Sequence, residues 1–266
     1  MKRTILILAF LAAAVAAQAQ ATAESAGVAG LSDGGSAAAG VQPAAESAGG
    51  DSAAEGASTA RREWLPSFDE VVVTAPVDIV FVRVPDTEAP RIVYDTRGAE
   101  NTRFTAEVRD RVLCIRERSD ARRTARTTVE VGYNDLKSLS LTGASATFGE
   151  PLTAHLLDLK VGERAVLRAE VDAGDLLAEL SGDGEAVLTG RVRYLTLDAS
   201  AGRFDASGME CMAARVVARN RAQVRLQAAD RLEIRATTGA SVRYGGAPRL
   251  LRIAEKVFPG QVVPTE

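Results

Sequence analysis

A degenerate repeat of about 20 residues runs from roughly Leu136 to Tyr244, and it constrains the fold more than any other feature of the chain. Each unit carries a small-residue turn followed by two apolar positions that are separated by one residue. Because successive side chains of a strand point to opposite faces, both positions face the same side of a strand. The first apolar column is Ala146, Ala165, Ala186, Phe204, Val224 and Val242, and the second is Phe148, Leu167, Leu188, Ala206, Leu226 and Tyr244.

A second alternating stretch lies upstream of each turn, so every unit offers at least two short strands. It contains the pairs Leu139 and Leu141, Leu157 and Leu159, Leu195 and Leu197, and Leu232 and Ile234. Stacked in parallel, equivalent residues would lie about 4.8 Å apart and form buried ladders. The pattern predicts an all-β chain that forms a parallel β-solenoid (β-helix). An antiparallel sandwich also gives short strands with frequent turns and remains the alternative.

The turns carry two further columns. A small column contains Ala144, Gly184, Gly202, Ala222 and Ala240 and is interrupted by Glu163, as expected where the backbone turns sharply. Directly before the first apolar column stand Ser145, Arg164, Glu185, Arg203, Gln223 and Ser241. The charged members alternate in sign, which stabilises neighbouring strands, whereas like charges would repel one another.

The N-terminus predicts export. Lys2 and Arg3 precede an apolar run that ends in Ala17-Gln-Ala19, the pattern of a signal peptide over residues 1–19 with cleavage after Ala19. A retained N-terminal anchor is the alternative, but the run is short for a membrane span. Residues 20–61 are almost all Ala, Gly, Ser and Thr with scattered acids, and their composition predicts a disordered spacer.

Charge argues against some classes of partner. Without Lys2 and Arg3, 30 of the 32 basic residues remain, and without the five acids of the spacer 30 of the 35 acids remain. A neutral folded part disfavours nucleic acid or an anionic membrane as the partner, although a local patch is compatible with it. The densest basic cluster, Arg122, Arg123 and Arg126, is interpreted as a solvated hairpin loop.

Residues 62–135 precede the repeat and are expected to form an N-terminal β cap, because an open stack end exposes a sheet edge. Asp110-Arg111 is a plausible tight turn within it. Residues 136–266 supply the coils and a C-terminal cap over Leu250 to Val263, where Pro259 and Pro264 discourage further pairing. The expected cap strands are Glu70–Thr74, Val77–Val84, Arg91–Asp95, Phe104–Val108, Val112–Arg116 and Thr127–Val131.

Four single residues invite a functional interpretation. Cys114 and Cys211 are the only cysteines; export permits a disulfide, but two separate, largely buried thiols are favoured. His155 is the only histidine, which argues against an imidazole metal site and a catalytic triad and favours a loop residue. Trp64 is interpreted as a plug that ties the first ordered turn to the core.

The enzymatic alternative is a polysaccharide-cleaving β-helix in which carboxylates on adjacent coils act as an acid and base pair. Asp158, Glu179 and Asp198 fall near equivalent outward positions, and Arg193, Arg203 and Arg215 are expected to neutralise such acids. Further acids nearby are Asp172, Asp175, Asp183 and Glu185. Aromatic residues, the stacking platforms of sugar sites, form only 5% of the chain. The sequence therefore assigns no catalytic, cofactor-binding or metal-binding residue.

The chain resembles the "putative autotransporter adhesin, head domain" family. The resemblance rests on Ser181-Gly-Asp-Gly-Glu185, on the opening stretch Phe68 to Ile79 and on Thr238-Gly-Ala-Ser-Val-Arg-Tyr244. It implies a signal peptide, a right-handed parallel β-solenoid and placement in the cell envelope, commonly of Gram-negative bacteria. The family supplies no catalytic residues.

These observations predict an exported, non-enzymatic β-solenoid of the cell envelope, in the periplasm or at the cell surface. Its expected role is adhesion, scaffolding or binding. The expected partner is an envelope or extracellular glycan or protein, with no nucleic acid, no cofactor and no membrane span after signal cleavage. The alternatives are a polysaccharide-cleaving enzyme and a domain that senses envelope stress. Neither the ligand nor the oligomeric state follows from the pattern.

Overall fold

The computed structural model describes residues 60–97, 103–118, 125–254 and 260–265, and these contain strands and turns but no helix. The expected signal peptide and the spacer up to residue 59 lie outside the described residues. So do Arg122 and Arg123 of the basic cluster, whereas Arg126 is described and forms an ion pair of 3.3 Å with Asp78.

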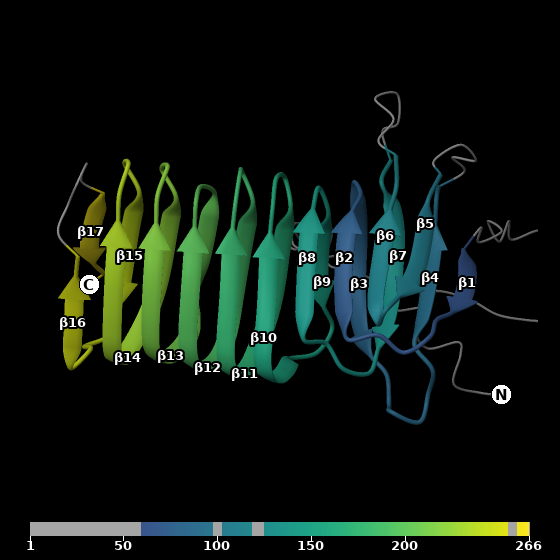
Figure 1. Ribbon diagram of the computed structural model, residues 1–266, viewed down its shortest axis with the longest axis horizontal. Coiled ribbons are helices and arrows are strands. Elements are labelled where there is room, and N and C mark those ends of the chain that lie inside the picture. Colours follow the sequence, from purple (N-terminus) through teal and green to yellow (C-terminus); the bar gives the residue numbers. More distant parts are fainter. Residues whose placement is uncertain (1–59, 98–102, 119–124, 255–259, 266) are drawn as a thin grey trace, which may run out of the picture. The chain divides into compact units, whose positions relative to one another are not determined.

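Within the described residues, seventeen strands belong to one continuous sheet system (Figure 1). Their bounds are β1 Arg61–Trp64, β2 Glu70–Thr74, β3 Val77–Arg83, β4 Arg91–Asp95, β5 Thr105–Arg109, β6 Val112–Arg116, β7 Thr127–Tyr133, β8 Ser138–Thr142, β9 Ser145–Phe148, β10 Leu152–Val161, β11 Val166–Leu180, β12 Glu185–Ala199, β13 Arg203–Ala218, β14 Gln223–Ala236, β15 Ser241–Gly245, β16 Leu250–Ile253 and β17 Gln261–Pro264.

The strands from β8 onward form a parallel β-solenoid, so the predicted fold class is confirmed and the antiparallel sandwich is excluded. Each long strand bends midway and pairs in parallel with the next strand along both halves. The equivalent residues Leu157, Leu176, Leu195, Ala214, Leu232 and Leu251 follow one another at intervals of 19, 19, 19, 18 and 19 residues. One coil therefore spans roughly 19 residues.

The core consists of ladders of apolar side chains that run along the stack. One ladder, with every member buried, is Leu113, Val71, Leu139, Leu159, Ala178, Leu197, Val216 and Ile234. Full burial of a Val, Leu or Ile side chain stabilises the fold by about 1.5–3 kcal/mol. The ladders thus supply the main stabilising term and hold the register at the same time.

The observed register corrects the alignment of one repeat. Leu167 pairs with Ala146, not with Phe148, so the unit that begins near Lys160 is displaced by two residues. The reason lies in the turn lengths: two residues separate β8 from β9, whereas four separate β10 from β11. Matching Gly143 to Gly162 overlooks the two extra residues of the longer turn. Arg164 therefore leaves the outward column, where Val166 takes its place.

This correction completes the small column of the turns. Its members are Ala144, Ala165, Gly184, Gly202, Ala222, Ala240 and Gly260, without interruption by Glu163. Each carbonyl from Ala144 to Ala240 accepts a hydrogen bond of 2.8–2.9 Å from the first residue after the turn of the next coil. At Gly202 the packing is so close that a Cβ atom would lie 2.3 Å from the carbonyl oxygen of Gly184. The turns must be small because they stack directly on one another.

The first coils do not follow chain order. Strands β2 and β3 pair with β6 and β7 on one side and with β8 and β9 on the other. The region before residue 135 therefore contains two coils of the stack, and the antiparallel strands β1, β4 and β5 cover their outer side. Asp110 and Arg111 form the expected tight turn between β5 and β6, with φ of 51° and 65°.

The two ends of the stack differ. At the C-terminal end, β16 pairs in parallel with β14 and β17 pairs in parallel with β15, so Leu250 to Val263 adds strands to the stack. Leu251 and Ile253 continue the inward ladders but are 40% and 42% exposed. The interpretation of Trp64 as a plug against the core is wrong. Trp64 lies on the edge strand β1 and is 63% exposed, whereas Leu65 and Phe68 are buried.

A charged cluster joins the segments around β2. The Asp69 carboxylate accepts hydrogen bonds from Arg111 Nε at 3.2 Å, Arg111 Nη2 at 3.0 Å and Lys137 Nζ at 2.9 Å, and its side chain is only 13% exposed. The Asp69 backbone carbonyl also accepts from the Lys137 amide at 2.8 Å. The hydrogen bonds from Arg111 and then from Lys137 lower the pKa of Asp69 below its ordinary value.

Replacing Gly202 by Ala tests the turn column. Gly202 and Gly239 both have positive φ, 79° and 75°, but a Cβ at Gly239 would meet only the Arg221 side chain at 3.7 Å. We expect G239A to lose about 1–2 kcal/mol of unfolding free energy from the backbone conformation alone. G202A should lose a further 1–3 kcal/mol or so because it also overpacks the turn. Urea denaturation of both variants measures the difference, and equal losses would contradict the stacking of the turns.

Replacing Asp69 by Asn tests the charged cluster. A depressed carboxyl pKa contributes stability that is present above the ordinary pKa of about 3.8 and is lost as the pH falls through the lower folded value. We expect the unfolding free energy of D69N to be about 1–2 kcal/mol below that of the wild type at pH 7, and this difference should shrink below pH ~4. Urea denaturation across this pH range measures the difference, and the exposed Asp86→Asn is the control. A difference that does not depend on pH would refute the role of ionisation.

Candidate functional site

The carboxylates singled out in the sequence do not form one column. Glu179 and Asp198 are register partners on β11 and β12, but Asp158 pairs with Leu177 and is two positions away. Lys160 occupies the place beside Glu179 that the sequence pattern assigned to Asp158. The three acids are therefore spread over an outward face.

Each of these acids has a cation beside it. Lys160 Nζ lies 3.6 Å from Asp158 Oδ2 and 3.9 Å from Glu179 Oε2, and Arg219 Nη2 lies 2.8 Å from Asp198 Oδ1. Neutralisation was expected, but the partners are Lys160 and Arg219 rather than Arg193, Arg203 and Arg215. The geometry gives no acid and base pair that faces a cleft. Within the described ranges, no group of three His, Cys, Asp or Glu side chains could hold a metal ion.

The other singled-out residues lie apart from one another. His155 is exposed in β10 and is not a loop residue. Cys114 on β6 and Cys211 on β13 are free thiols. Six strand-to-strand steps separate β6 from β13, about 29 Å at 4.8 Å a step, which is far beyond disulfide reach. Burial raises the pKa of the Cys211 thiol to about 12, so it stays protonated.

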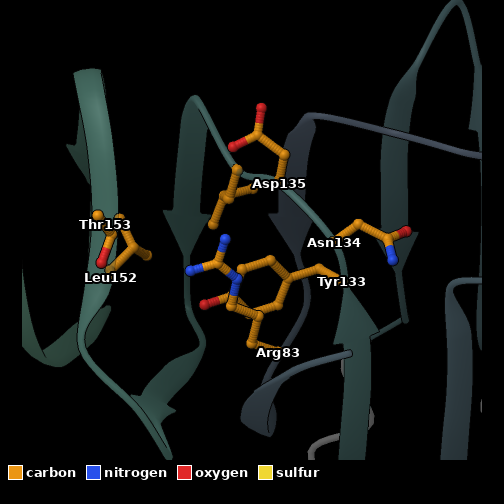
Figure 2. Close-up of a pocket in the computed structure, with 7 residues that line it drawn as sticks. Arg83, Tyr133, Asn134, Asp135, Leu152 and Thr153 are labelled. Carbon is orange, nitrogen blue, oxygen red and sulfur yellow. The ribbon is translucent and has the colours of Figure 1, made fainter. Parts of the chain in front are cut away.

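A narrow crevice lies where β3, β7 and β10 approach (Figure 2). Its lining includes Arg83, Tyr133, Asn134 and Leu152. Burial raises the pKa of Tyr133 to about 12, and its ring contacts Phe81 and Phe148 edge-on. The crevice has no interior space that a water molecule could occupy. We interpret it as packing of the aromatic core and not as a binding site.

Charge is distributed unevenly along the stack, a feature that the neutral total conceals. Residues 136–210 contain seven basic residues and twelve acids, whereas residues 211–254 contain nine arginines and two acids. This asymmetry can be found from the sequence by counting charged residues segment by segment. The arginines of the last coils are Arg215, Arg219, Arg221, Arg225, Arg231, Arg235, Arg243, Arg249 and Arg252, and the acids are Asp230 and Glu233.

A groove of about 490 Å³ is lined mostly by residues of this basic segment, with Ser207 before it and Thr265 after it. It follows the outward side of β13, β14 and β15, next to the bend of each coil. Register places Asp205, Arg225 and Arg243 side by side on these three strands. The polar lining of the groove comprises Ser207, Arg225, Gln227, Arg243 and Thr265, with Gly245 and Gly246 at one side.

Asp205 on β13 is the register partner of Arg225, which lines the groove. Its carboxylate accepts from Ser207 Oγ at 2.6 Å and from the Ser207 amide at 3.2 Å, and it lies 3.5 Å from Arg203 and 3.7 Å from Arg225. Burial is the largest single effect on its pKa and raises it, but the Ser207 hydrogen bonds and the two arginines together lower the pKa below the ordinary value. Asp205 therefore remains ionised and orients Arg225.

A third surface feature is apolar. Leu156, Leu177, Tyr194 and Met212 are large side chains that are 40–53% exposed near the bends of β10 to β13. In the register, Asp175 lies between Leu156 and Tyr194. Asp175 thus separates Leu156 from Tyr194, and the four apolar side chains do not form one continuous face.

The sequence profile of the family described as "Putative auto-transporter adhesin, head GIN domain" matches residues 67–248, more than half of the chain. The chain belongs to this family. The resemblance inferred from the Ser181 turn and the opening and closing stretches is therefore confirmed. The match begins just before β2 and ends after β15, so the head GIN domain includes the coils of the N-terminal region.

Solved structures share the fold at low identity. A "putative adhesin" from Bacteroides fragilis superimposes with a TM-score of 0.67 at 15% identity, covering 77% of this chain and 96% of that one. One from Parabacteroides merdae gives a TM-score of 0.60 at 17% identity, covering 78% and 96%. A "putative lipid binding protein" from Parabacteroides distasonis gives 0.57 at 16% identity, covering 78% and 96%. At such identities the likeness demonstrates the fold alone.

Comparison with curated protein sequences finds no match. Within the part of the chain that the structure describes, no helix has the length and apolar character needed to cross a membrane.

Proposed function

We propose that this head GIN domain protein is an exported, non-enzymatic module that binds an envelope or extracellular ligand through the outward faces of its coils. The observation that carries the proposal is the arrangement of the acids: the predicted catalytic candidates stand on an open face, each beside a cation at 2.8–3.9 Å. Such pairing suits a solvated surface and does not prepare an acid for proton transfer.

Two further observations support a binding role. A stack of coils offers a long rigid surface on which side chains repeat at the spacing of neighbouring strands, about 4.8 Å. The names of the family and of the superimposed structures describe adhesins and a lipid-binding protein, and none describes an enzyme. A polysaccharide-cleaving enzyme remains the second hypothesis, because acids on adjacent coils are the feature on which such enzymes depend.

Binding without turnover is the first expected outcome. Beads coated with the full chain should adhere to immobilised glycans or to surface proteins, and the reducing ends of any bound polysaccharide should not increase with time. The triple variant Asp158→Asn, Glu179→Gln, Asp198→Asn should still adhere, because a binding role assigns these acids no chemical step and none of them lines the groove of β13, β14 and β15. Cleavage that the triple variant loses would favour the enzyme, and failure to adhere to every surface would refute the binding role.

Export is the second expected outcome. Residues 1–19 carry the charge and apolar pattern of a signal peptide, and the family name suggests a place outside the cytoplasm. We expect fractionation of Gram-negative cells that express the full chain to recover a protein that begins at Gln20 in the periplasm or the medium. Substituting Ala17 and Ala19 by bulky residues should leave the precursor uncleaved. A cytoplasmic protein that begins at Met1 would contradict export.

A further inference from the structure

We propose that the groove formed by β13, β14 and β15 binds the oxyanion groups, carboxylate or sulfate, of an acidic polysaccharide. This inference rests on the proposed binding function and names the class of its ligand and the residues that recognise it. It depends on five observations: two adjacent arginines, an acid that is fully engaged, neutral polar groups in the lining, a hollow of suitable size and an excess of positive charge around it.

Arg225 and Arg243 are register partners on neighbouring parallel strands, so their Cα atoms lie about 4.8 Å apart. Like charges at such positions repel one another. Arg243 forms no ion pair with any described residue, and Arg225 shares Asp205 with Arg203 at a distance of 3.7 Å. An oxyanion between the two guanidinium groups would relieve the repulsion and accept hydrogen bonds from both planar forks.

Asp205 does not neutralise the groove. Its oxygen atoms are occupied by the Ser207 amide and hydroxyl and by the flanking arginines, and its side chain is mostly buried. Arg203 and Arg225 flank this carboxylate, and Arg243 lies one strand beyond Arg225. The other acid beside the groove is Glu210, the register partner of Gln227, so three arginines stand against two acids. The excess of positive charge faces outward, which is the arrangement expected of a site for an anion.

Neutral groups favour a sugar over a bare anion. Gln227, which lines the groove, donates from Nε2 to the Ser207 carbonyl at 2.6 Å, and its side-chain carbonyl oxygen is an acceptor. The hydroxyl of Thr265 adds a group that both donates and accepts. Sugar hydroxyls need such mixed partners, and the volume of about 490 Å³ lies within the usual range for small-ligand sites.

Glycine keeps the groove open at its bend. Gly246 has a φ of 85°, and a Cβ atom there would lie 2.4 Å from the Ala228 carbonyl oxygen. This close approach brings the chain after β15 against the preceding coil, and no side chain at position 246 fills the space beside Arg243. The last coils also carry nine arginines against two acids over residues 211–254, which would steer an anionic polymer to this end of the stack.

Two other anionic partners fit less well. A nucleic acid would use aromatic side chains on which bases stack, and no aromatic side chain lines the groove. An anionic membrane would need apolar side chains that insert beside the basic residues, but Leu226, the one large apolar residue in the lining, is buried. Both are outcomes of the test.

The experiment measures binding of the full chain to polygalacturonate, which carries carboxylates, and to dextran sulfate, with neutral dextran, phosphatidylglycerol vesicles and single-stranded DNA as comparison ligands. The variant is Arg243→Gln. The matched control is Arg235→Gln, because Arg235 is also exposed without an ion pair to a described residue but lies on the other half of β14, where it pairs with Val217. Both variants change the net charge equally.

We expect R243Q to weaken binding to at least one of the two acidic polysaccharides by about tenfold or more, as for the loss of a charge-assisted pair, and R235Q to change it less than twofold. Arg243→Lys should restore part of the affinity, because it keeps the charge but not the planar fork. Equal weakening by R243Q and R235Q would overturn the groove in favour of diffuse electrostatics. Equal binding of neutral dextran, or tighter binding of vesicles or DNA than of both polysaccharides, would overturn the ligand class.

The failure of this inference can be told apart from failure of the proposed function. If beads coated with R243Q adhere to glycans or surface proteins as well as wild-type beads do, the module binds but not through this groove. If wild-type beads adhere to nothing, the binding function itself is wrong. Urea denaturation should give R243Q the stability of the wild type within about 0.5 kcal/mol, as for an exposed residue, so that a loss of affinity reports on the groove.

Discussion

The direct stacking of one turn on the next is the constraint on which the rest of this structure depends. Ala144, Ala165, Gly184, Gly202, Ala222, Ala240 and Gly260 occupy equivalent positions, and the carbonyl of each of the first six accepts an amide from the following coil. A side chain larger than a methyl group in this column would separate the coils. Because the turns set the spacing, the ladders of Leu, Val and Ile on both halves of the coil come into register and bury one another.

Once the register is set, the outward columns follow, and they decide the chemistry of the surface. In the middle coils an acid and a cation meet across neighbouring strands, as Glu179 meets Lys160 and Asp172 meets Arg191. In the last coils arginine meets arginine, as at Arg225 and Arg243. The same backbone therefore presents a balanced surface in one part and an unbalanced cationic surface in another. This contrast locates the groove that we propose as the binding site.

Several elements of the fold could be predicted from the sequence. Strands β2, β4 and β6 have the predicted bounds, and the turn at Asp110-Arg111 joins β5 to β6. These successes share a cause: period-two alternation and turn residues act within a few positions along the chain. The displaced alignment at Leu167 and the exposed Trp64 share another cause. Turn length at one coil, and the position of β1 on a sheet edge, depend on contacts with strands that are remote in sequence.

The sequence by itself determined the all-β class, the length of the coil, the inward positions of each strand and the family, because all of these depend on local alternation and on a repeat that can be aligned. Only the tertiary structure decided that β2 and β3 lie between β6–β7 and β8–β9, that Asp158 is out of line with Glu179 and Asp198, and that Arg225 lies beside Arg243. The physical reason is that hydrogen bonds between strands select the neighbour. A shift of two residues preserves every inward and outward assignment yet changes which charges meet.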